Sequence, residues 1–186
     1  MPANISTAIQ FIVNALTSLY LLVLLLRFWM PWLRADFRNP LAQGILRLTS
    51  PLVVPVRRLV PSFGRLDTAT VLVAFIIQYL TIMLLLLIQN RSAGIVPIAS
   101  TAFVKLAVLS LNLFVYAIFI RIILSWIAPG SHNPATAIIT TLTEPVLRPF
   151  RRLVPALGGF DISPIFAIIL LGAATILISG FSQLAI

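Results

Sequence analysis

Residues 143–155 read TEPVLRPFRRLVP, and most of this stretch recurs 94 positions earlier as TSPLVVPVRRLVP, residues 49–61. Each copy joins two long apolar segments and carries two adjacent arginines between prolines. The match extends outward without a gap to the pairs Arg27/Arg121, Trp32/Trp126, Asn39/Asn133, Pro40/Pro134, Gly64/Gly158 and Asp67/Asp161. A gapless match of this length predicts that the chain is two copies of one unit, residues 1–93 and 94–186.

The composition is that of a membrane protein. Of the 186 residues, 60% are hydrophobic and only 9% are charged, whereas roughly a quarter of a soluble domain is charged. The 13 basic and four acidic residues give a net charge of +9, and the basic residues cluster beside apolar segments. Such clusters report topology and contact with anionic lipid headgroups, so we do not expect nucleic acid as a direct partner.

The sequence has few of the residues that usually act in catalysis or metal binding. The chain has no cysteine and one histidine, His132, which excludes disulfides, thiolate sites and multi-histidine metal sites within one chain. No phosphate-binding glycine loop and no Ser/His/Asp arrangement is recognisable. We therefore expect no enzymatic activity, no metal and no cofactor.

Four apolar segments are long enough to cross a hydrocarbon core of about 30 Å at about 1.5 Å per residue. They lie at about 5–30, 70–89, 102–127 and 162–183, with a link between the halves at 90–101. No Lys or Arg precedes Arg27, and the first segment is too long for a signal peptide, so we expect it to be retained. The prediction is an all-α membrane protein with four transmembrane helices in two parallel two-helix repeats.

A basic connection joins the two spans of each repeat. Asn39-Pro40 and Asn133-Pro134 are helix-start signals, and apolar residues at helical spacing follow each of them, which predicts a short amphipathic helix in the membrane interface. The later prolines, at 51, 55 and 61 in the first copy, are expected to divide the rest into short pieces.

The distribution of positive charge predicts the orientation. Seven basic residues lie at or inside the first connection and four at or inside the second, but only Arg91 and Lys105 lie near the middle link. The positive-inside rule then puts both connections on the cytoplasmic side and both termini in the periplasm. Two units of the same orientation form a parallel repeat whose connections meet on one face. Lys105 is expected to extend to the membrane surface.

The second copy resembles the signature of the YggT family, called YlmG in other bacteria. The residues that carry the resemblance are Glu144-Pro145, Arg148-Pro149, Arg151-Arg152-Leu153-Val154-Pro155, Gly158-Gly159 and Asp161. The resemblance covers the whole chain and implies a multi-pass bacterial inner-membrane protein without an established reaction. It further implies roles associated with relatives, namely membrane-complex assembly, nucleoid or division organisation, and ion or osmotic homeostasis.

The first copy departs from this signature at three positions: Ser50 replaces the glutamate, Val54 replaces the first arginine and Arg65 replaces the second glycine. If the signature carries an activity, the second copy is therefore the better candidate to hold it.

The candidate binding residues are charged and belong to the two motif copies. They are Glu144, Arg148, Arg151, Arg152, Arg57 and Arg58. One interpretation is a cluster that binds anionic headgroups or a protein partner, with about 1 kcal/mol from each Lys or Arg near an anionic leaflet. The other is that Glu144 caps a short helix and the arginines are solvated charges.

Other motif residues lie at the ends of the spans. Asp67 and Asp161 suit the positive ends of the second and fourth helix dipoles, while Arg27 and Arg121 lie in the last turns of the first and third helices. The arginines can extend to the membrane surface, or they can pair with the aspartates as buried functional pairs. Either arrangement fixes the helix ends at one depth.

The sequence supports two hypotheses for the function. The first is a scaffold or assembly protein that recruits lipid or protein partners, with self-association left open. The alternative is a small channel or an accessory in ion homeostasis, with Gln10, Asn14, Gln78 and Asn112 along a shared path. These four side chains would converge on a wet cavity in a channel, whereas in a scaffold each would bond to a neighbouring helix.

Overall fold

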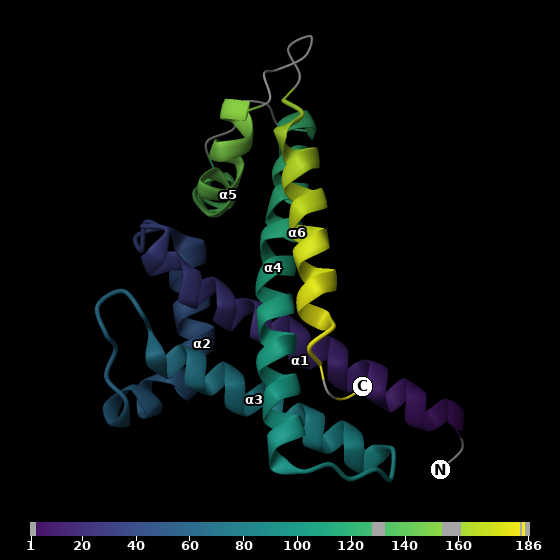
Figure 1. The fold of residues 1–186 in the computed structure, drawn as a ribbon. Coiled ribbons are helices and arrows are strands. Elements are labelled where there is room, and N and C mark those ends of the chain that lie inside the picture. Colours follow the sequence, from purple (N-terminus) through teal and green to yellow (C-terminus); the bar gives the residue numbers. More distant parts are fainter. Residues whose placement is uncertain (1–2, 128–132, 154–160, 183, 185–186) are drawn as a thin grey trace.

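The computed structural model describes residues 3–127, 133–153, 161–182 and 184, and this part of the chain is built from helices (Figure 1). The helices are α1 (Ala3–Trp32), α2 (Pro40–Leu59), α3 (Thr68–Ile88), α4 (Ile95–Ile127), α5 (Pro134–Leu153) and α6 (Ser163–Ser179). The predicted all-helical class is confirmed.

The helices follow the internal repeat. Adding 94 to the bounds of α2 gives Pro134–Leu153, which are the bounds of α5. In the same way α1 corresponds to α4, and α3 corresponds to α6. The duplicated sequence therefore forms the same three elements twice: a long apolar helix, an amphipathic helix and a second apolar helix.

Each repeat forms an antiparallel pair of apolar helices. Helix α1 packs against α3, and α4 packs against α6. Figure 1 shows that the α1/α3 pair crosses the α4/α6 pair obliquely, with α2 and α5 at adjoining ends of the two pairs. The predicted parallel arrangement about an axis along the membrane normal stays a prediction, because the helices alone do not define that normal.

Three helices are long and apolar enough to cross a membrane: α1, α3 and α4. Helix α6 is also apolar but has 17 residues, or about 25 Å at 1.5 Å per residue, which is less than a hydrocarbon core of about 30 Å. It ends at Ser179, earlier than the predicted 183, because the chain turns at Gly180. Large apolar side chains such as Phe11, Phe119 and Ile169 face outward from these helices, as expected where lipid replaces water.

The link between the repeats is shorter than the sequence predicts. Helix α4 begins at Ile95 rather than near residue 102. Pro97 does not prevent this earlier start, because the amides of a first helical turn have no partner inside the helix. As a result Lys105 lies ten residues inside the helix, about 15 Å from its start.

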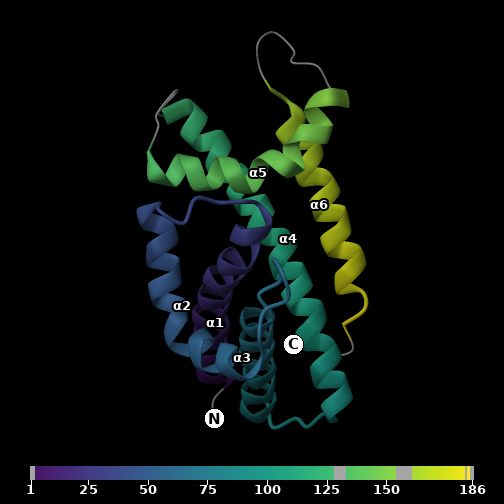
Figure 2. The ribbon, with the colours of Figure 1, turned by 90° about the vertical axis from the view of Figure 1, so that its left-hand side faces the viewer.

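The prediction that prolines divide the connections into short pieces is wrong. Helix α2 continues through Pro51 and Pro55, and α5 continues through Pro145 and Pro149. Each pair has a spacing of four, so both prolines lie on one exposed side of their helix. There the missing amide hydrogen bonds produce a bend instead of a break, and both helices bend along their course in Figure 2.

The two repeats share a core where α1 meets α4. The Trp29 indole N–H donates to the Ser110 hydroxyl at 2.8 Å, and its ring packs edge-on against Phe114 with centroids 5.0 Å apart. The connections also touch, because the Asn39 side-chain amide donates to the Pro134 carbonyl at 2.7 Å.

Candidate functional site

The first arginine cluster comprises Arg27, Thr49, Arg57 and Asp67 and ties α2 to both spans of its repeat. Arg27 is 3% exposed and donates to the Thr49 hydroxyl at 2.8 Å, while its Nε lies 3.6 Å from the Asp67 carboxylate. Arg57, in the last turn of α2, donates to the same carboxylate. Asp67 also accepts from Thr70 at the start of α3, where the helix dipole favours a negative charge.

The second arginine cluster repeats this plan with Arg121, Thr143, Glu144, Arg151 and Asp161. Arg121 donates to the Thr143 hydroxyl at 2.7 Å and to the Glu144 carboxylate at 3.0 Å. Arg151 then bridges Glu144 at 3.0 Å and Asp161 at 2.8 Å. These bonds join α4, α5 and the start of α6.

The clusters differ in charge. The first has one carboxylate between two arginines, and the second has two carboxylates for two arginines, because Glu144 stands where the first copy has Ser50. Partial burial opposes ionisation, yet the hydrogen bond from Arg121 and the charge of Arg151 hold the pKa of Glu144 below its ordinary value. Likewise burial opposes ionisation of Asp161, but bonds from Ser163 and Arg151 lower its pKa.

This geometry changes the interpretation of the motif residues. Arg27 is buried against Asp67 and does not extend to the membrane surface, whereas Arg121 pairs with Glu144 instead of Asp161. Glu144 lies inside α5, so it does not cap a short helix.

The predicted binding residues divide into two groups. Glu144, Arg57 and Arg151 form ion pairs within the clusters. Arg58, Arg148 and Arg152 are exposed on the outer sides of α2 and α5 and form no ion pair within the described part of the chain, whereas Arg57 is paired although its side chain is 42% exposed.

The remaining motif residues shape the ends of α2 and α5. Asn39 accepts from the Leu41 amide at 2.9 Å, with Pro40 in the first turn. Asn133 accepts from the Thr136 amide at 2.8 Å ahead of α5, which starts at Pro134. Both are the N-caps that the Asn-Pro signal predicts. Gly64 takes a φ of 59° in the turn before α3, whereas its counterpart Gly158 lies outside the described residues.

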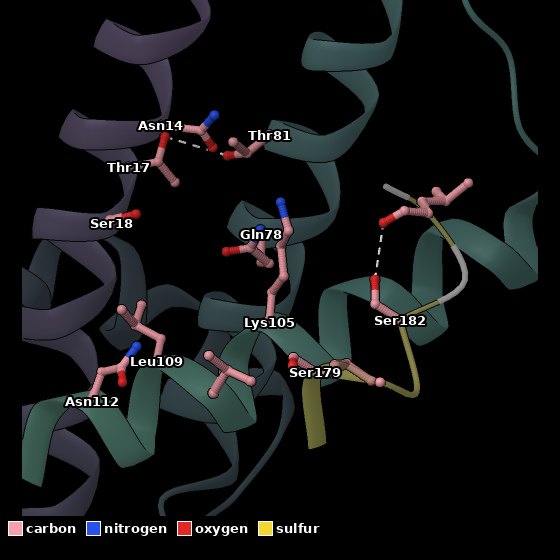
Figure 3. A pocket seen from close by; sticks show the side chains of 14 residues that line it. Asn14, Thr17, Ser18, Gln78, Thr81, Lys105, Leu109, Asn112, Ser179 and Ser182 are labelled. Atoms are coloured by element: carbon pink, nitrogen blue, oxygen red, sulfur yellow. Dashed lines mark hydrogen bonds between the residues drawn. The ribbon is translucent and has the colours of Figure 1, made fainter. Parts of the chain in front are cut away.

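A polar cavity of about 650 Å³ lies between α1, α3, α4 and the segment after α6 (Figure 3). It is separate from the arginine clusters: Asn14 precedes Arg27 by more than three turns of α1, Gln78 lies near the middle of α3, and the α6 side is its last turn. Its polar lining residues are Asn14, Thr17, Ser18, Gln78, Thr81, Lys105, Asn112, Ser179 and Ser182.

Three of the four amide residues predicted from the sequence converge on this cavity: Asn14, Gln78 and Asn112. Gln78 is only 7% exposed, and within the described part of the chain none of these three side chains makes a hydrogen bond. The fourth residue, Gln10, bonds to Gln89 at 3.0 Å across α1 and α3 and belongs to a packing seam. The three cavity-facing amides are therefore open to hydrogen bonds with water or a bound solute.

The sequence did not lead us to predict that Lys105 lines the cavity. Its side chain extends from α4 into the cavity toward Gln78 and Thr81 (Figure 3), although we expected it at the membrane surface. The reason is the earlier start of α4, which places Lys105 three turns inside the helix. Its seven-residue spacing from Asn112, which puts both on one helix face, was the signal available in the sequence.

The lining of the cavity is mainly amides, hydroxyls and aliphatic side chains. Among the residues that the structure describes, no group of three or more His, Cys, Asp or Glu side chains could hold a metal ion. The amides and hydroxyls of the lining can donate and accept hydrogen bonds, and Lys105 is the charged side chain among the described lining residues.

Comparison with known proteins identifies relatives over almost the whole chain. Two segments, residues 6–88 and 100–182, match the family described as CCB3/YggT. The chain is 43% identical to "Uncharacterized protein PA0392" of Pseudomonas aeruginosa over 170 residues, which are 90% of this chain and 86% of the relative. It is 34% identical to "Uncharacterized protein YggT" of Escherichia coli (strain K12) over 164 residues, 88% and 85% of the two chains.

A plant relative is similar over a shorter region. The "YlmG homolog protein 2, chloroplastic" of Arabidopsis thaliana is 38% identical over 68 residues, or 35% of this chain and 26% of that protein. No solved structure matches the chain. Since the family match takes in both halves and the bacterial relatives align over most of their length, the chain belongs to the CCB3/YggT family.

Proposed function

We propose that this protein is a non-enzymatic scaffold of the bacterial inner membrane that binds anionic lipid headgroups, and through them membrane complexes under assembly, with the outer sides of α2 and α5. In this proposal α6 is the fourth span, both connections face the cytoplasm and both termini face the periplasm. The excess of arginine in the connections supports that orientation.

The observation that carries the proposal is that some motif arginines form ion pairs and others do not. Arg57 and Arg151 are held by carboxylates, whereas Arg58, Arg148 and Arg152 are exposed on the amphipathic helices and form no ion pair with a described residue. Exposed apolar side chains of the same helices, such as Leu48 and Leu153, suit the boundary between headgroups and acyl chains.

The test compares two triple variants reconstituted in phosphatidylcholine vesicles that contain phosphatidylglycerol. In one variant Arg58, Arg148 and Arg152 are changed to Ala, and in the other to Lys. Three charges at about 1 kcal/mol each correspond to a loss of about 100-fold in relative affinity for phosphatidylglycerol. The loss should appear in the Ala variant, measured with spin-labelled lipids, and the Lys variant should keep most of the affinity. Equal preference of the Ala variant and the unaltered protein would overturn the proposal.

The polar cavity favours a second candidate, an accessory role in solute or ion homeostasis. Asn14, Gln78 and Asn112 line one cavity and lack protein partners among the described residues, the arrangement expected of a solute-handling protein. This candidate is tested by uptake of a polar solute into proteoliposomes, where Asn112→Leu should reduce uptake and the exposed-site change Arg148→Ala should not.

A further inference from the structure

We infer that the first arginine cluster is a specific site for the phosphodiester of an anionic phospholipid, which takes the place that the Glu144 carboxylate has in the second cluster. The inference rests on the proposed function and deepens it. It adds one defined lipid site to the general attraction of headgroups by the exposed arginines Arg58, Arg148 and Arg152.

The second cluster provides a template for an anion held between two arginines. Both terminal nitrogens of Arg121 donate to one oxygen of the Glu144 carboxylate, at 3.0 and 3.1 Å. Arg151 donates to the same carboxylate at 3.0 Å. A carboxylate at this position therefore accepts charge-assisted hydrogen bonds from two sides.

The first cluster has the two arginines of this arrangement without the second carboxylate. Ser50 stands at the position of Glu144, and among the described residues Asp67 alone pairs with Arg27 and Arg57. Arg57 uses one terminal nitrogen for Asp67, and its other N–H groups form no hydrogen bond within the described part of the chain. The Arg27 Nε is buried without a hydrogen-bond partner. The cluster therefore has an excess of one positive charge.

Ser50 connects the buried arginine to the surface of α2. Its hydroxyl accepts from Arg27 at 3.3 Å and can donate to an anion at the same time. Arg57 follows Ser50 by seven residues, which puts both on one side of the helix, and its side chain is 42% exposed. A phosphate at Ser50 can therefore bond to the serine and to Arg57, next to the charge of Arg27.

A shallow groove on α2 begins at this position and determines which kind of anion fits. It is lined by Leu46, Arg47, Ser50, Pro51, Val54 and Pro55. Aliphatic side chains and prolines suit an acyl chain at the boundary between headgroups and hydrocarbon, so the groove favours a lipid over a free anion.

The charge of the site selects among lipids. A phosphodiester carries one negative charge, which balances the excess of one in the cluster, and its two free oxygens can accept from an arginine and a hydroxyl together. A lipid with a positive headgroup, such as phosphatidylcholine, would bring that charge close to Arg47, which lines the groove, and to the arginines of the cluster. Phosphatidylglycerol has no such positive group and is the expected ligand.

Native mass spectrometry of the detergent-solubilised protein counts bound lipid molecules. The protein is titrated with phosphatidylglycerol, with phosphatidylcholine, and with phosphatidylglycerol in the presence of inorganic phosphate. We expect one phosphatidylglycerol to bind about tenfold more tightly than further copies and than phosphatidylcholine, because it gains charge-assisted hydrogen bonds that they lack. Equal binding of the two lipids would overturn the inference, and displacement by an equal concentration of inorganic phosphate would overturn the assignment to a lipid.

Exchanging the residues at positions 50 and 144 tests the place of the site. Ser50→Glu supplies the carboxylate of the second cluster and should weaken the tight phosphatidylglycerol step by about tenfold. Folded Glu144→Ser protein should gain a second tight step, because the second cluster then has the same excess of positive charge. Ser62→Glu adds the same negative charge at an exposed serine outside the cluster and should bind like the unaltered protein. An unchanged tight step in Ser50→Glu, or one tight step in Glu144→Ser, would contradict the inference.

The triple variant of Arg58, Arg148 and Arg152 leaves this cluster intact, so the two ideas can fail separately. If the triple Ala variant loses its preference for phosphatidylglycerol in vesicles but the unaltered protein shows no tight step, only this inference is wrong. If the tight step responds to Ser50→Glu but the triple Ala variant keeps its preference in vesicles, only the proposed role of the exposed arginines is wrong.

Discussion

At the scale of single residues, the two arginine clusters neutralise the charge of an arginine in two different ways. Each must neutralise an arginine that is brought into the protein by an apolar helix. In the first cluster Arg27 depends on Asp67, whose side chain is 8% exposed. In the second, Glu144 stands beside Arg121, and its side chain is 44% exposed. The first solution is the more buried, so it is the more sensitive to loss of its carboxylate.

We expect Asp67→Ala to lower the free energy of unfolding by about 3–5 kcal/mol, because it leaves a buried arginine without its carboxylate. Adding Ser50→Glu should restore about 1.5 kcal/mol or more, because Ser50 already accepts from Arg27 at 3.3 Å and occupies the position of Glu144. Denaturant unfolding in detergent measures both changes. Ser50→Gln is the control of equal size, and recovery by this neutral residue would show that charge is not the cause.

The lowered pKa values of Glu144 and Asp161 predict acid sensitivity of the second repeat. A carboxyl group with a lowered folded-state pKa contributes stability above its unfolded value of about 4 and loses that contribution as the pH falls through the folded value. Thermal unfolding followed from pH 7 to pH 3 should therefore show a decline below about pH 4. The double variant Glu144→Gln, Asp161→Asn should be less stable at pH 7 and decline less, and an unchanged pH profile would count against these pairs.

Sequence reasoning identified most of the cluster residues but not their pairing. The motif marked Arg27, Asp67, Arg121 and Asp161, because each recurs in both copies. Their partners depend on the depth and direction of helices, which the spacing of residues does not define. Lys105 was missed for a related reason: its depth depends on where α4 begins, and Pro97 and Gly94 suggested a link where the helix has already started.

At the scale of elements, α2 and α5 are the parts that differ most from the expectation. Proline removes one amide donor and clashes with the preceding turn, which argues for a break. The structure keeps both helices intact because the apolar side, with Val53 and Leu147 fully buried, packs without interruption. Tertiary packing thus outweighs local propensity, and the prolines set the curvature of each connection.

Replacing both Pro51 and Pro55 by Ala should straighten α2. A straight helix separates Gln43 and Leu59 by about 24 Å at 1.5 Å per residue, and the bent helix holds them closer together. Because the chain has no cysteine, spin labels on introduced cysteines at these two exposed positions can report the distance. A lengthened distance together with a weakened Arg57–Asp67 pair is the expected result. The same distance with and without the prolines would mean that packing alone sets the curve.

At the scale of the whole molecule, the charged clusters and the polar cavity occupy different places along the helices. One end carries the arginine clusters and the exposed arginines of α2 and α5. The polar cavity with Lys105 lies nearer the middle of α1, α3 and α4. The apolar pattern and the basic connections predicted the helices and the place of the arginine clusters, but the cavity depends on contacts between helices that are distant in sequence.

The connection between α2 and α3 and the connection between α3 and α4 should lie on opposite sides of the membrane. Single cysteines at Ser62, between α2 and α3, and at Ser92, between α3 and α4, are exposed and have no background from native cysteine. A membrane-impermeant thiol reagent added to intact spheroplasts should label the cysteine at 92 and spare the one at 62. Labelling of both positions, or of 62 alone, would reverse or break the proposed topology.

The hydrogen bond from Asn39 to the Pro134 carbonyl has a consequence for how the two halves of the sequence can evolve. In a dimer of two separate single units, an isologous interface repeats every contact, so both asparagines would have to make the same hydrogen bond to the other unit. Here both asparagines cap their own helices, but among the described residues only Asn39 also donates to the other connection, and the interface is not obliged to be symmetric. Joining the units in one reading frame allows a substitution in one half without the same substitution in the other. Glu144 and Lys105, which have Ser50 and Phe11 as their counterparts, are two residues that a symmetric ancestor could not have gained in one copy alone.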